Sequence, residues 1–274
     1  MSGSIEQLLP RPSVMGVVNV TPDSFSDGGA FFHPAPAITE ARAMVDEGAA
    51  IVDIGGESTR PGSEGVSLEE ELARVEPVLE ALGDVPLSID TSKAEVARRA
   101  LAAGALLVND VTALRGDPDL AGVVAGSEAC LCLMHMLGEP RTMQDAPRYD
   151  DVVSEVKAFL EERLAFATDA GIPEERVCLD PGIGFGKTVE HNLELLARLD
   201  EIAALGRPVL VGASRKRFLG RILGNQDALT GPVAAGVGVA VLAYERGASI
   251  FRVHDVREHV EALTAAHALE EVRP

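Results

Sequence analysis

Positive charge is scarce in this chain of 274 residues. Its 24 lysine and arginine residues are outnumbered by 43 aspartate and glutamate residues, which gives a formal net charge of −19 at pH 7. Nucleic acids and anionic membranes bind through clustered Lys and Arg, so this balance argues against either as a partner. An anionic substrate would gain nothing from the overall field, and its attraction must come from cations close to its binding site.

Cysteines and long apolar runs are also scarce. The three cysteines, Cys130, Cys132 and Cys178, fit no C-x-x-C pattern and lie within apolar runs, so we expect them to be small core residues in a reducing cytoplasm. The longest nearly uncharged apolar stretch, residues 233–244, is too short to span a bilayer. Residues 1–12 lack the basic start and the apolar stretch of a signal peptide. These features predict a cytoplasmic protein.

Short apolar runs alternate with amphipathic segments along the chain. Near-continuous apolar runs are typical of parallel strands buried on both faces. The runs cover residues 14–20, 49–56, 86–91, 106–111, 130–136, 176–182, 208–214 and 248–255. The segments between them repeat apolar residues with helical spacing, and several end at a glycine, as helices often do.

Two folds have this alternation of strands and helices, a closed barrel and an open doubly wound sheet. No G-x-G-x-x-G follows the first strand, as a dinucleotide-binding sheet would require. Eight units in about 250 residues favour closure. We therefore predict an α/β fold, a single (β/α)8 TIM barrel, with residues 1–13 as an N-terminal arm and residues 14–274 as the barrel domain.

Each predicted strand begins apolar and ends polar. In a parallel barrel all of these ends lie on one rim, where the loops form the active site. A single Asn or Asp could be a turn former or a helix cap, but a polar group at every strand end indicates a polar pocket. The strand-end residues are Asn19, Asp53, Asp90, Asn109, His135, Asp180, Ser214, Arg252 and His254.

Cations gather at the last two strands. Residues 212–218 contain three of them, and phosphate sites in barrels often lie after strands seven and eight. Arg252 and His254, two residues apart on one strand, point the same way, so an anion such as phosphate is expected here. Lys216 is expected in the site.

Other basic residues are expected to be structural. Lys187 closes a Gly-rich loop, 180–187, that narrowly misses a phosphate-binding P-loop pattern, and it is expected to be a solvated residue of the next helix. His135 is expected to be a hydrogen-bonded rim residue and no metal ligand. The remaining histidines, His33, His191, His259 and His267, are expected in loops or on helix surfaces.

Eight segments together resemble the dihydropteroate synthase family, in that family's order and over nearly the whole chain. They are MGVVNVTPDSFSDGG, DIGGESTRPGS, SIDTSKAEVARRALAAGA, LVNDVTAL, LMHMLGEPRTMQ, LDPGIGFGKTVEHN, GASRKRFLG and FRVHDV. The resemblance implies condensation of 6-hydroxymethyl-7,8-dihydropterin diphosphate with 4-aminobenzoate, giving 7,8-dihydropteroate and diphosphate in folate biosynthesis. It also implies a homodimer. One segment, TGPVAAGVGVAV (230–241), departs from the family pattern near the helix that supports this dimer.

The resemblance also implies a role for each site residue. The pterin would be held by Asp90, Asn109, Asp180 and Lys216. The diphosphate would be bound by Arg252, His254 and a Mg²⁺ ion that meets Asn19, with Asp27 nearby. The aminobenzoate would contact Ser214, Phe185 and Pro61, while Thr59 and Arg60 close over the site.

The chemistry fits a dissociative substitution. Loss of diphosphate leaves positive charge on a methylene conjugated with the pterin ring, which carboxylates such as Asp90 and Asp27 would stabilise. These two residues and Lys216 are the expected catalytic residues. The neutral amine of 4-aminobenzoate is already nucleophilic and needs no strong base.

Two alternatives remain open. A pterin-barrel methyltransferase could share the pterin-holding residues, but it would have no use for a diphosphate site. A catalytically silent paralogue that binds a pterin or a protein would require no catalytic chemistry, although no motif is missing.

Overall fold

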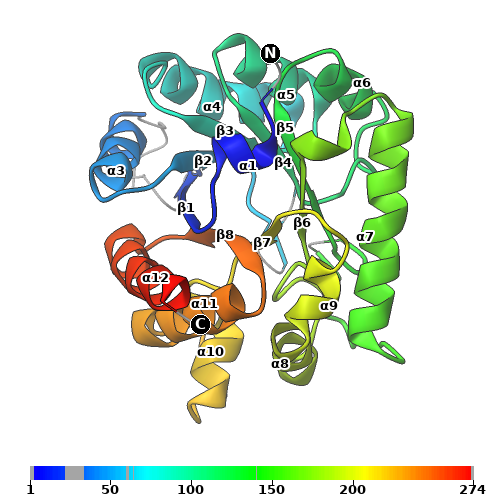
Figure 1. The fold of residues 1–274 in the computed structure, drawn as a ribbon. Helices are drawn as coiled ribbons and strands as arrows, with labels where there is room; N and C mark the ends of the chain where they lie inside the picture. Colours follow the sequence, from blue (N-terminus) through cyan, green and yellow to red (C-terminus); the bar gives the residue numbers. More distant parts are fainter. Residues whose placement is uncertain (1–2, 22–33, 60–61, 64, 140, 273–274) are drawn as a thin grey trace.

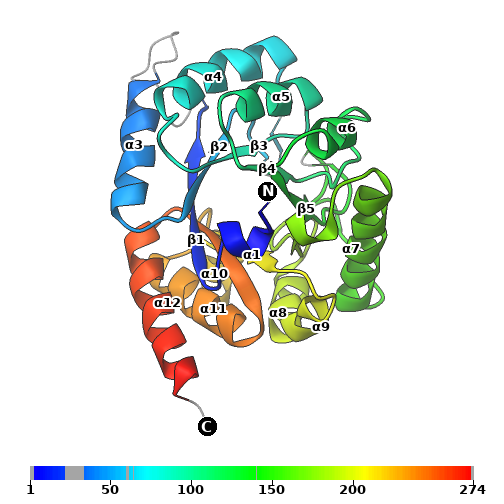
Figure 2. The ribbon, with the colours of Figure 1, turned by 45° about the horizontal axis from the view of Figure 1, so that its top comes forward.

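Eight parallel strands form a closed barrel in the computed structural model, which describes residues 3–21, 34–59, 62–63, 65–139 and 141–272. Each strand pairs with the next in the chain, and β8 closes the barrel against β1 (Figures 1 and 2). The strands are β1 (Ser13–Asn19), β2 (Ile51–Gly55), β3 (Leu87–Asp90), β4 (Leu107–Asp110), β5 (Cys130–Met134), β6 (Val177–Asp180), β7 (Val209–Val211) and β8 (Ala248–Val253). The predicted TIM barrel is confirmed.

Helices surround the barrel on the outside (Figure 1). Those described are α1 (Ile5–Leu8), α3 (Ala35–Asp46), α4 (Leu68–Ala81), α5 (Ala94–Ala102), α6 (Leu120–Ala125), α7 (Val152–Asp169), α8 (Val189–Ala197), α9 (Leu199–Ala203), α10 (Arg217–Ile222), α11 (Val233–Glu245) and α12 (Val256–Glu271), with a 3-10 turn at Glu174–Arg176. Gly48, Gly104 and Gly171 follow helices with positive φ, as predicted. Among the described residues, no helix is both long and apolar enough to cross a membrane.

An apolar plug fills the amino-terminal half of the barrel. Ile5 and Leu9, from α1 and the residue after it, are almost fully buried against side chains that point inward from the strands. The three cysteines lie in the same cluster, buried and unbonded, which confirms the prediction that they are core residues. Burial raises the pKa of the Cys130 thiol to about 12. The plug leaves the opposite, carboxyl-terminal end for polar side chains.

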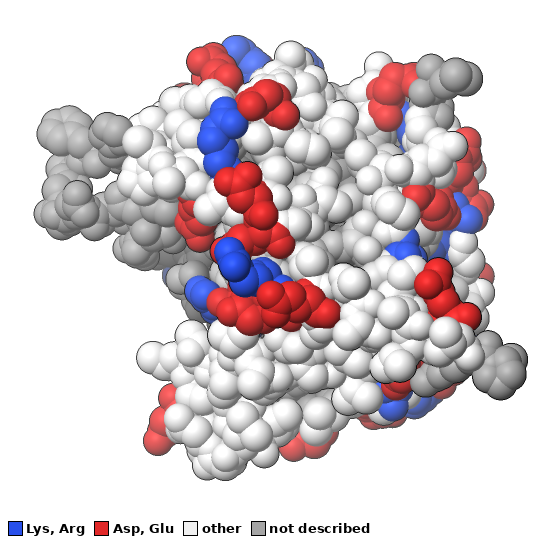
Figure 3. All heavy atoms as spheres, turned by 60° about the vertical axis from the view of Figure 1, so that its left-hand side comes forward, with Lys and Arg blue, Asp and Glu red and all other residues white. Residues whose placement is uncertain are grey.

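Charged side chains on the outer surface lie in mixed groups. On the face that Figure 3 shows, the visible Lys and Arg side chains each lie beside Asp or Glu. Arg42 pairs with Asp84 at 2.8 Å, and Arg257 lies 3.7 Å from Glu47. Such exposed pairs contribute little to stability. On this face the exposed cations are therefore offset by neighbouring acidic side chains.

Candidate active site

A hydrogen-bonded polar layer lies inside the barrel at the carboxyl ends of the strands. Arg252 donates from Nε to Oδ2 of Asp53 at 2.7 Å, and from a terminal nitrogen to Oδ2 of Asp90 at 2.8 Å. The side-chain amide of Asn109 donates to the same Asp53 oxygen at 2.9 Å. Strands β8, β2, β3 and β4 thus bring together one cation, two carboxylates and an amide.

Asp53 is the buried centre of this layer, although the family resemblance assigns it no role. Its side chain is inaccessible to solvent. By accepting from both Arg252 and Asn109 it sets the direction in which each of these side chains points. The sequence shows Asp53 only as one more polar strand end, and nothing in the pattern distinguishes it from its neighbours.

Two buried carboxyl groups at the rim, those of Asp90 and Asp180, have pKa values close to neutral pH. Burial raises the pKa of Asp90 to about 7, against the opposing charge of Arg252. Burial raises the pKa of Asp180 to about 6, against a hydrogen bond from the Gly182 N–H. Burial alone would lower the pKa of Arg252, but Asp53 and Asp90 outweigh it and the net shift is upward. The rim therefore holds a permanent cation between groups whose charge depends on pH.

A glycine loop, residues 182–186, carries Phe185 into the site after β6. Oδ1 of Asp180 accepts from the Gly182 N–H at 2.7 Å, which ties the start of the loop to the strand end. Gly182 has φ +67°, and a Cβ there would lie 1.9 Å from the carbonyl oxygen of His135, so only glycine fits. The Phe185 ring lies 4.0 Å from Nζ of Lys216. Two of the predicted site residues therefore meet directly.

Lys187 is not solvated, and the prediction that it lies on a helix surface is wrong. It is 3% exposed, and its Nζ lies 2.9 Å from Nδ1 of His135 and 3.0 Å from the carbonyl oxygen of Phe185. Helix α8 begins later than expected, with Thr188 as its N-cap. Lys187 therefore precedes the helix and turns inward under the glycine loop.

Histidines in the described residues are mostly tied into the structure. His135 is a hydrogen-bonded rim residue, as predicted, and burial lowers its pKa to about 2. His259 is 1% exposed, with Nδ1 2.6 Å from the carbonyl oxygen of Asp255, so its prediction as a surface residue is wrong. It lies on the face of α12 that packs inward. His191 completes the N-cap of α8, and His33 lies outside the described residues.

The cation-rich segment after β7 meets the end of β8. The backbone N–H of His254 donates to Oγ of Ser214 at 3.2 Å, and Nδ1 of His254 lies 3.4 Å from the same oxygen. Burial, and then the charge of Arg252, lower the pKa of His254 to about 3. The Arg215 side chain forms an ion pair with Asp255 at 2.5 Å. The imidazole of His254 is therefore neutral in the ligand-free site, where it can offer an anion a hydrogen-bond donor.

The loop after β2 is anchored by a network that the sequence does not reveal. Arg74 of α4 donates to the Gly56 carbonyl at 2.7 Å. Lys93 pairs with Glu57 of the loop and, at 2.6 Å, with the fully buried Glu71 of α4. In the sequence Glu71 is one of three successive glutamates, a pattern that normally indicates an exposed helix.

The remaining predicted site residues are only partly described. Asn19 ends β1 and is half-buried, and Thr59, also half-buried, lies in the loop after β2. Asp27, Arg60 and Pro61 lie outside the described residues.

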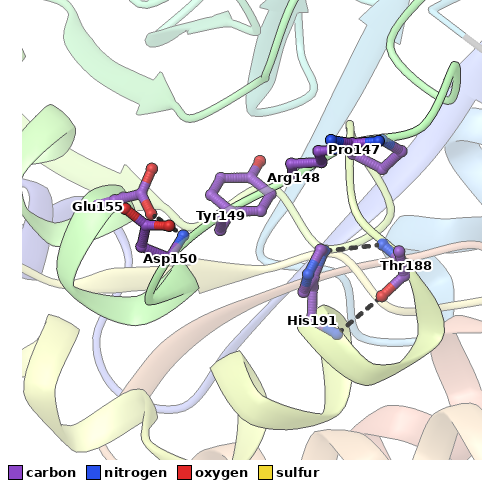
Figure 4. A pocket seen from close by; sticks show the side chains of 7 residues that line it. All are labelled: Pro147, Arg148, Tyr149, Asp150, Glu155, Thr188 and His191. Carbon is purple, nitrogen blue, oxygen red and sulfur yellow. Dashed lines mark hydrogen bonds between the residues drawn. The ribbon is translucent and has the colours of Figure 1, made fainter.

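A hollow of about 490 Å³ lies beside the rim, where the segment before α7 meets the start of α8. Figure 4 shows Tyr149 between Asp150 on one side and the Thr188–His191 cap on the other. The rings of Tyr149 and His191 meet edge to face, with centroids 4.9 Å apart. This hollow is separate from the polar layer around Arg252.

The barrel and its polar rim define a TIM-barrel enzyme, and the comparisons identify its class. The family model of pterin binding enzymes matches residues 15–254. The dihydropteroate synthase of Escherichia coli K12 is 48% identical over 95% of this chain and 92% of its own length. That of Synechocystis is 47% identical over 94% of this chain and 90% of its own.

Solved structures agree with the sequence comparison. The Xanthomonas albilineans dihydropteroate synthase with 4-aminobenzoic acid has a TM-score of 0.88 and 48% identity, covering 96% of this chain and 95% of that one. The same synthase in complex with 7,8-dihydropteroate has a TM-score of 0.84 and 46% identity over the same shares. The chain therefore belongs to the pterin binding enzymes. Within them it falls among the dihydropteroate synthases, which are transferases of folate biosynthesis, and the family resemblance is confirmed.

Proposed function

We propose that this chain condenses 6-hydroxymethyl-7,8-dihydropterin diphosphate with 4-aminobenzoate, giving 7,8-dihydropteroate and diphosphate. The observation that carries the proposal is the rim layer, in which Arg252 donates to both Asp90 and Asp53, and Asp53 also accepts from Asn109. A pterin requires carboxylate and amide partners, and a leaving diphosphate requires a cation. The layer supplies both within one hydrogen-bonded network.

The pterin edge would be held by Asp180 and Asn109. That edge offers a ring N–H and an amino group, which one ionised carboxylate can accept together. Asp180 is 5% exposed and already accepts from the Gly182 N–H through Oδ1. Its oxygens are therefore fixed in direction before the pterin binds. Lys216, whose Nζ lies over the Phe185 ring, would contact the pterin ring.

Substitution would proceed by loss of the leaving group first. The C–O bond breaks, its electron pair leaves with diphosphate, and the methylene becomes cationic. Asp90 and Asp27 would stabilise this charge, which a buried carboxylate does far better than one in water. The amine nitrogen of 4-aminobenzoate then forms the C–N bond with its lone pair and loses a proton to solvent. No covalent enzyme intermediate is needed.

The diphosphate would be bound by Arg252 and His254. Nε and one terminal nitrogen of Arg252 already donate to Asp53 and Asp90, so the anion would use the other terminal nitrogen. His254 would add a neutral donor. The anion would then lie above the carboxylates, with Arg252 between the two.

A Mg²⁺ ion carried by the diphosphate would meet Asn19. Among the described residues, no three His, Cys, Asp or Glu side chains are grouped to hold a metal. Mg²⁺ commonly takes one or two protein oxygens and completes its shell with phosphate and water. The amide oxygen of Asn19 fits that need, because Asn19 ends β1 at the rim, and β1 is the neighbour of β8, where Arg252 pairs with Met15 lower in the barrel. Bound there, the ion would neutralise charge on the leaving group.

The aminobenzoate would lie between the glycine loop and the segment after β7. Phe185 and Ser214 would contact it, together with Pro61, while Thr59 and Arg60 close from the loop after β2. The anchoring of Gly56 and Glu57 by Arg74 and Lys93 supports this role, because it holds the base of that loop.

The enzyme would act as a homodimer in the cytoplasm. Helix α8 packs against α10 and α11, and the three lie together at the lower edge of Figure 1. These helices and the segment between α10 and α11 carry exposed large apolar side chains, with exposures between 43% and 79%: Leu193, Ile222, Leu223, Leu229 and Leu242. Helix α11 carries one charged residue, Glu245. A second copy of the same face would cover this apolar surface, and the buried thiols suit a reducing compartment.

Diphosphate release tests the proposal. With Mg²⁺ present, the protein should release diphosphate rapidly only when the pterin diphosphate and 4-aminobenzoate are supplied together. Equal release without 4-aminobenzoate would indicate a hydrolase. No release by folded protein would favour the silent paralogue.

A further inference from the structure

The backbone of the glycine loop is intrinsically flexible, because three of its five residues are glycines. Gly182, Gly184 and Gly186 have φ values of +67°, +85° and +64°. Glycine adopts such conformations freely and loses more conformational entropy than other residues when it is fixed. The loop nevertheless places the Phe185 ring 4.0 Å from Nζ of Lys216. Something outside the loop must fix it.

Side chains from neighbouring elements bind the loop backbone nearly residue by residue. Around Gly184, Oδ1 of Asn192 accepts from the N–H at 2.6 Å, and Nε2 of Gln144 donates to the carbonyl at 2.7 Å. The Tyr149 hydroxyl donates to the Gly186 carbonyl at 2.8 Å. Each bond goes to the backbone, so together they specify the conformation of the loop and not its sequence.

Lys187 makes the bond that matters most for the site, because it holds Phe185 itself. Its Nζ donates to the Phe185 carbonyl at 3.0 Å and lies 2.9 Å from Nδ1 of His135. The His135 ring in turn packs edge to face with the Phe159 ring, with centroids 4.9 Å apart at an interplanar angle of 87°. The contacts run from α7 through the end of β5 to the loop after β6.

Burying the Lys187 amine is unfavourable for folding. It is 3% exposed, and its direct contacts are a neutral imidazole and a carbonyl. An apolar side chain of the same length would fill this space without the desolvation of an ammonium group. Stability therefore does not explain a lysine here, whereas a donor that reaches the Phe185 carbonyl does.

We propose that Lys187 and His135 form a positioning pair that sets Phe185 against Lys216 and so shapes the aminobenzoate side of the site. Neither residue touches substrate in this account. The assignment rests on the proposed function, since it takes Phe185 as an aminobenzoate contact. The pterin anchors Asp180 and Asn109 lie on strands, and their described side-chain hydrogen bonds go to groups outside the pair. Lys187 acts on Asp180 through its charge, which lowers the pKa of that carboxyl, so pterin affinity is measured above pH 8, where Asp180 is ionised with or without Lys187.

Lys187→Met tests the pair, with Lys157→Met on α7 as the matched control. Loss of one hydrogen bond to the loop should raise KM for 4-aminobenzoate about tenfold, and change pterin affinity by less than about threefold. Amide hydrogen exchange across residues 181–188 should become faster in Lys187→Met. Lys157→Met should match wild type in all three measurements.

Tyr149→Phe gives a second test that leaves the core intact. It removes only the hydroxyl that binds Gly186, and we expect a smaller rise in the same KM with faster exchange in the same segment. If Lys187→Met raised the pterin Kd as much as the KM for 4-aminobenzoate, or left both the KM and loop exchange unchanged, the positioning role would be wrong. Amide hydrogen exchange in the loop can be measured whether or not the enzyme is active. It therefore distinguishes failure of this positioning role from failure of the proposed function, in which wild-type protein would make no dihydropteroate.

Discussion

A terminal nitrogen of Arg252 lies 2.8 Å from Oδ2 of Asp90. The residue proposed to bind the leaving diphosphate is therefore paired with the residue proposed to stabilise the methylene cation. When diphosphate departs, the two developing charges arise next to a cation and an anion that already neutralise each other. This pairing, together with the pair between Arg252 and Asp53, keeps the three groups oriented in a buried layer.

Replacing Arg252 by Ala should destabilise the fold. The Asp53 carboxylate would remain buried without its cation, at a cost of about 3 kcal/mol, toward the lower end for buried pairs because the Arg252 side chain is 22% exposed. Denaturant unfolding measures this loss. Adding Asp53→Asn to Arg252→Ala should restore part of it, and an additive further loss would show that Asp53 does not depend on Arg252.

Arg252→Ala should also weaken binding of the pterin diphosphate far more than binding of the pterin that lacks its diphosphate. Only the first ligand uses the anion site. Equilibrium titration of both ligands decides this, with Arg257→Ala on the exposed face of α12 as control. Equal weakening of both ligands would mean that Arg252 contacts the pterin ring and does not grip phosphate.

Asp180→Asn should reduce pterin affinity while keeping the shape of the side chain. One oxygen becomes an amide donor that faces a pterin donor, which should cost roughly 2–4 kcal/mol, or about thirtyfold to a thousandfold in Kd. Calorimetric titration measures the change. Asp200→Asn, an exposed carboxylate on α9, is the matched control, and an unchanged Kd for Asp180→Asn would leave it a loop anchor only.

Lys187 should contribute stability that increases as the pH rises above neutrality. Burial lowers the pKa of this amine to about 7, with Asp180 opposing the shift and Lys216 adding to it. Between pH 7 and the ordinary lysine pKa, the unfolded chain binds a proton that the folded chain does not, so raising the pH favours folding. The buried thiols of Cys130 and Cys132 act in the opposite direction, so the two variants are compared: the change in denaturation midpoint from pH 7 to pH 10 should be more positive in Lys157→Met than in Lys187→Met. An equal change in both variants would contradict the buried amine.

Activity should fall on the acid side of neutrality. Asp90 and Asp180 titrate near pH 7 and pH 6 because they are buried, and both must be ionised for the proposed roles. We therefore expect kcat/KM for the pterin diphosphate to drop as pH falls through this range. Affinity for the pterin without diphosphate, which has no titrating phosphate, should drop with it. A flat profile for that ligand would contradict the assignment of Asp180.

The barrel, and the grouping of polar strand-end side chains at one rim, follow from the sequence. Apolar runs with polar ends predict barrel strands because every strand is buried on both faces and meets the same rim. The burial of Lys187 could not be predicted in this way, since its position before α8 does not show whether its side chain points outward or under the glycine loop. The burial of Glu71 could not be predicted either, because three successive glutamates give no sign that one of them is buried beneath a loop.

The most direct test of the account is the stoichiometry of product to diphosphate. The protein is supplied with Mg²⁺, the pterin diphosphate and isotopically labelled 4-aminobenzoate, and dihydropteroate is measured by mass spectrometry alongside released diphosphate. We predict one labelled dihydropteroate for each diphosphate, with slow release when 4-aminobenzoate is omitted. Diphosphate released without labelled dihydropteroate would contradict the claim that this rim joins the two substrates.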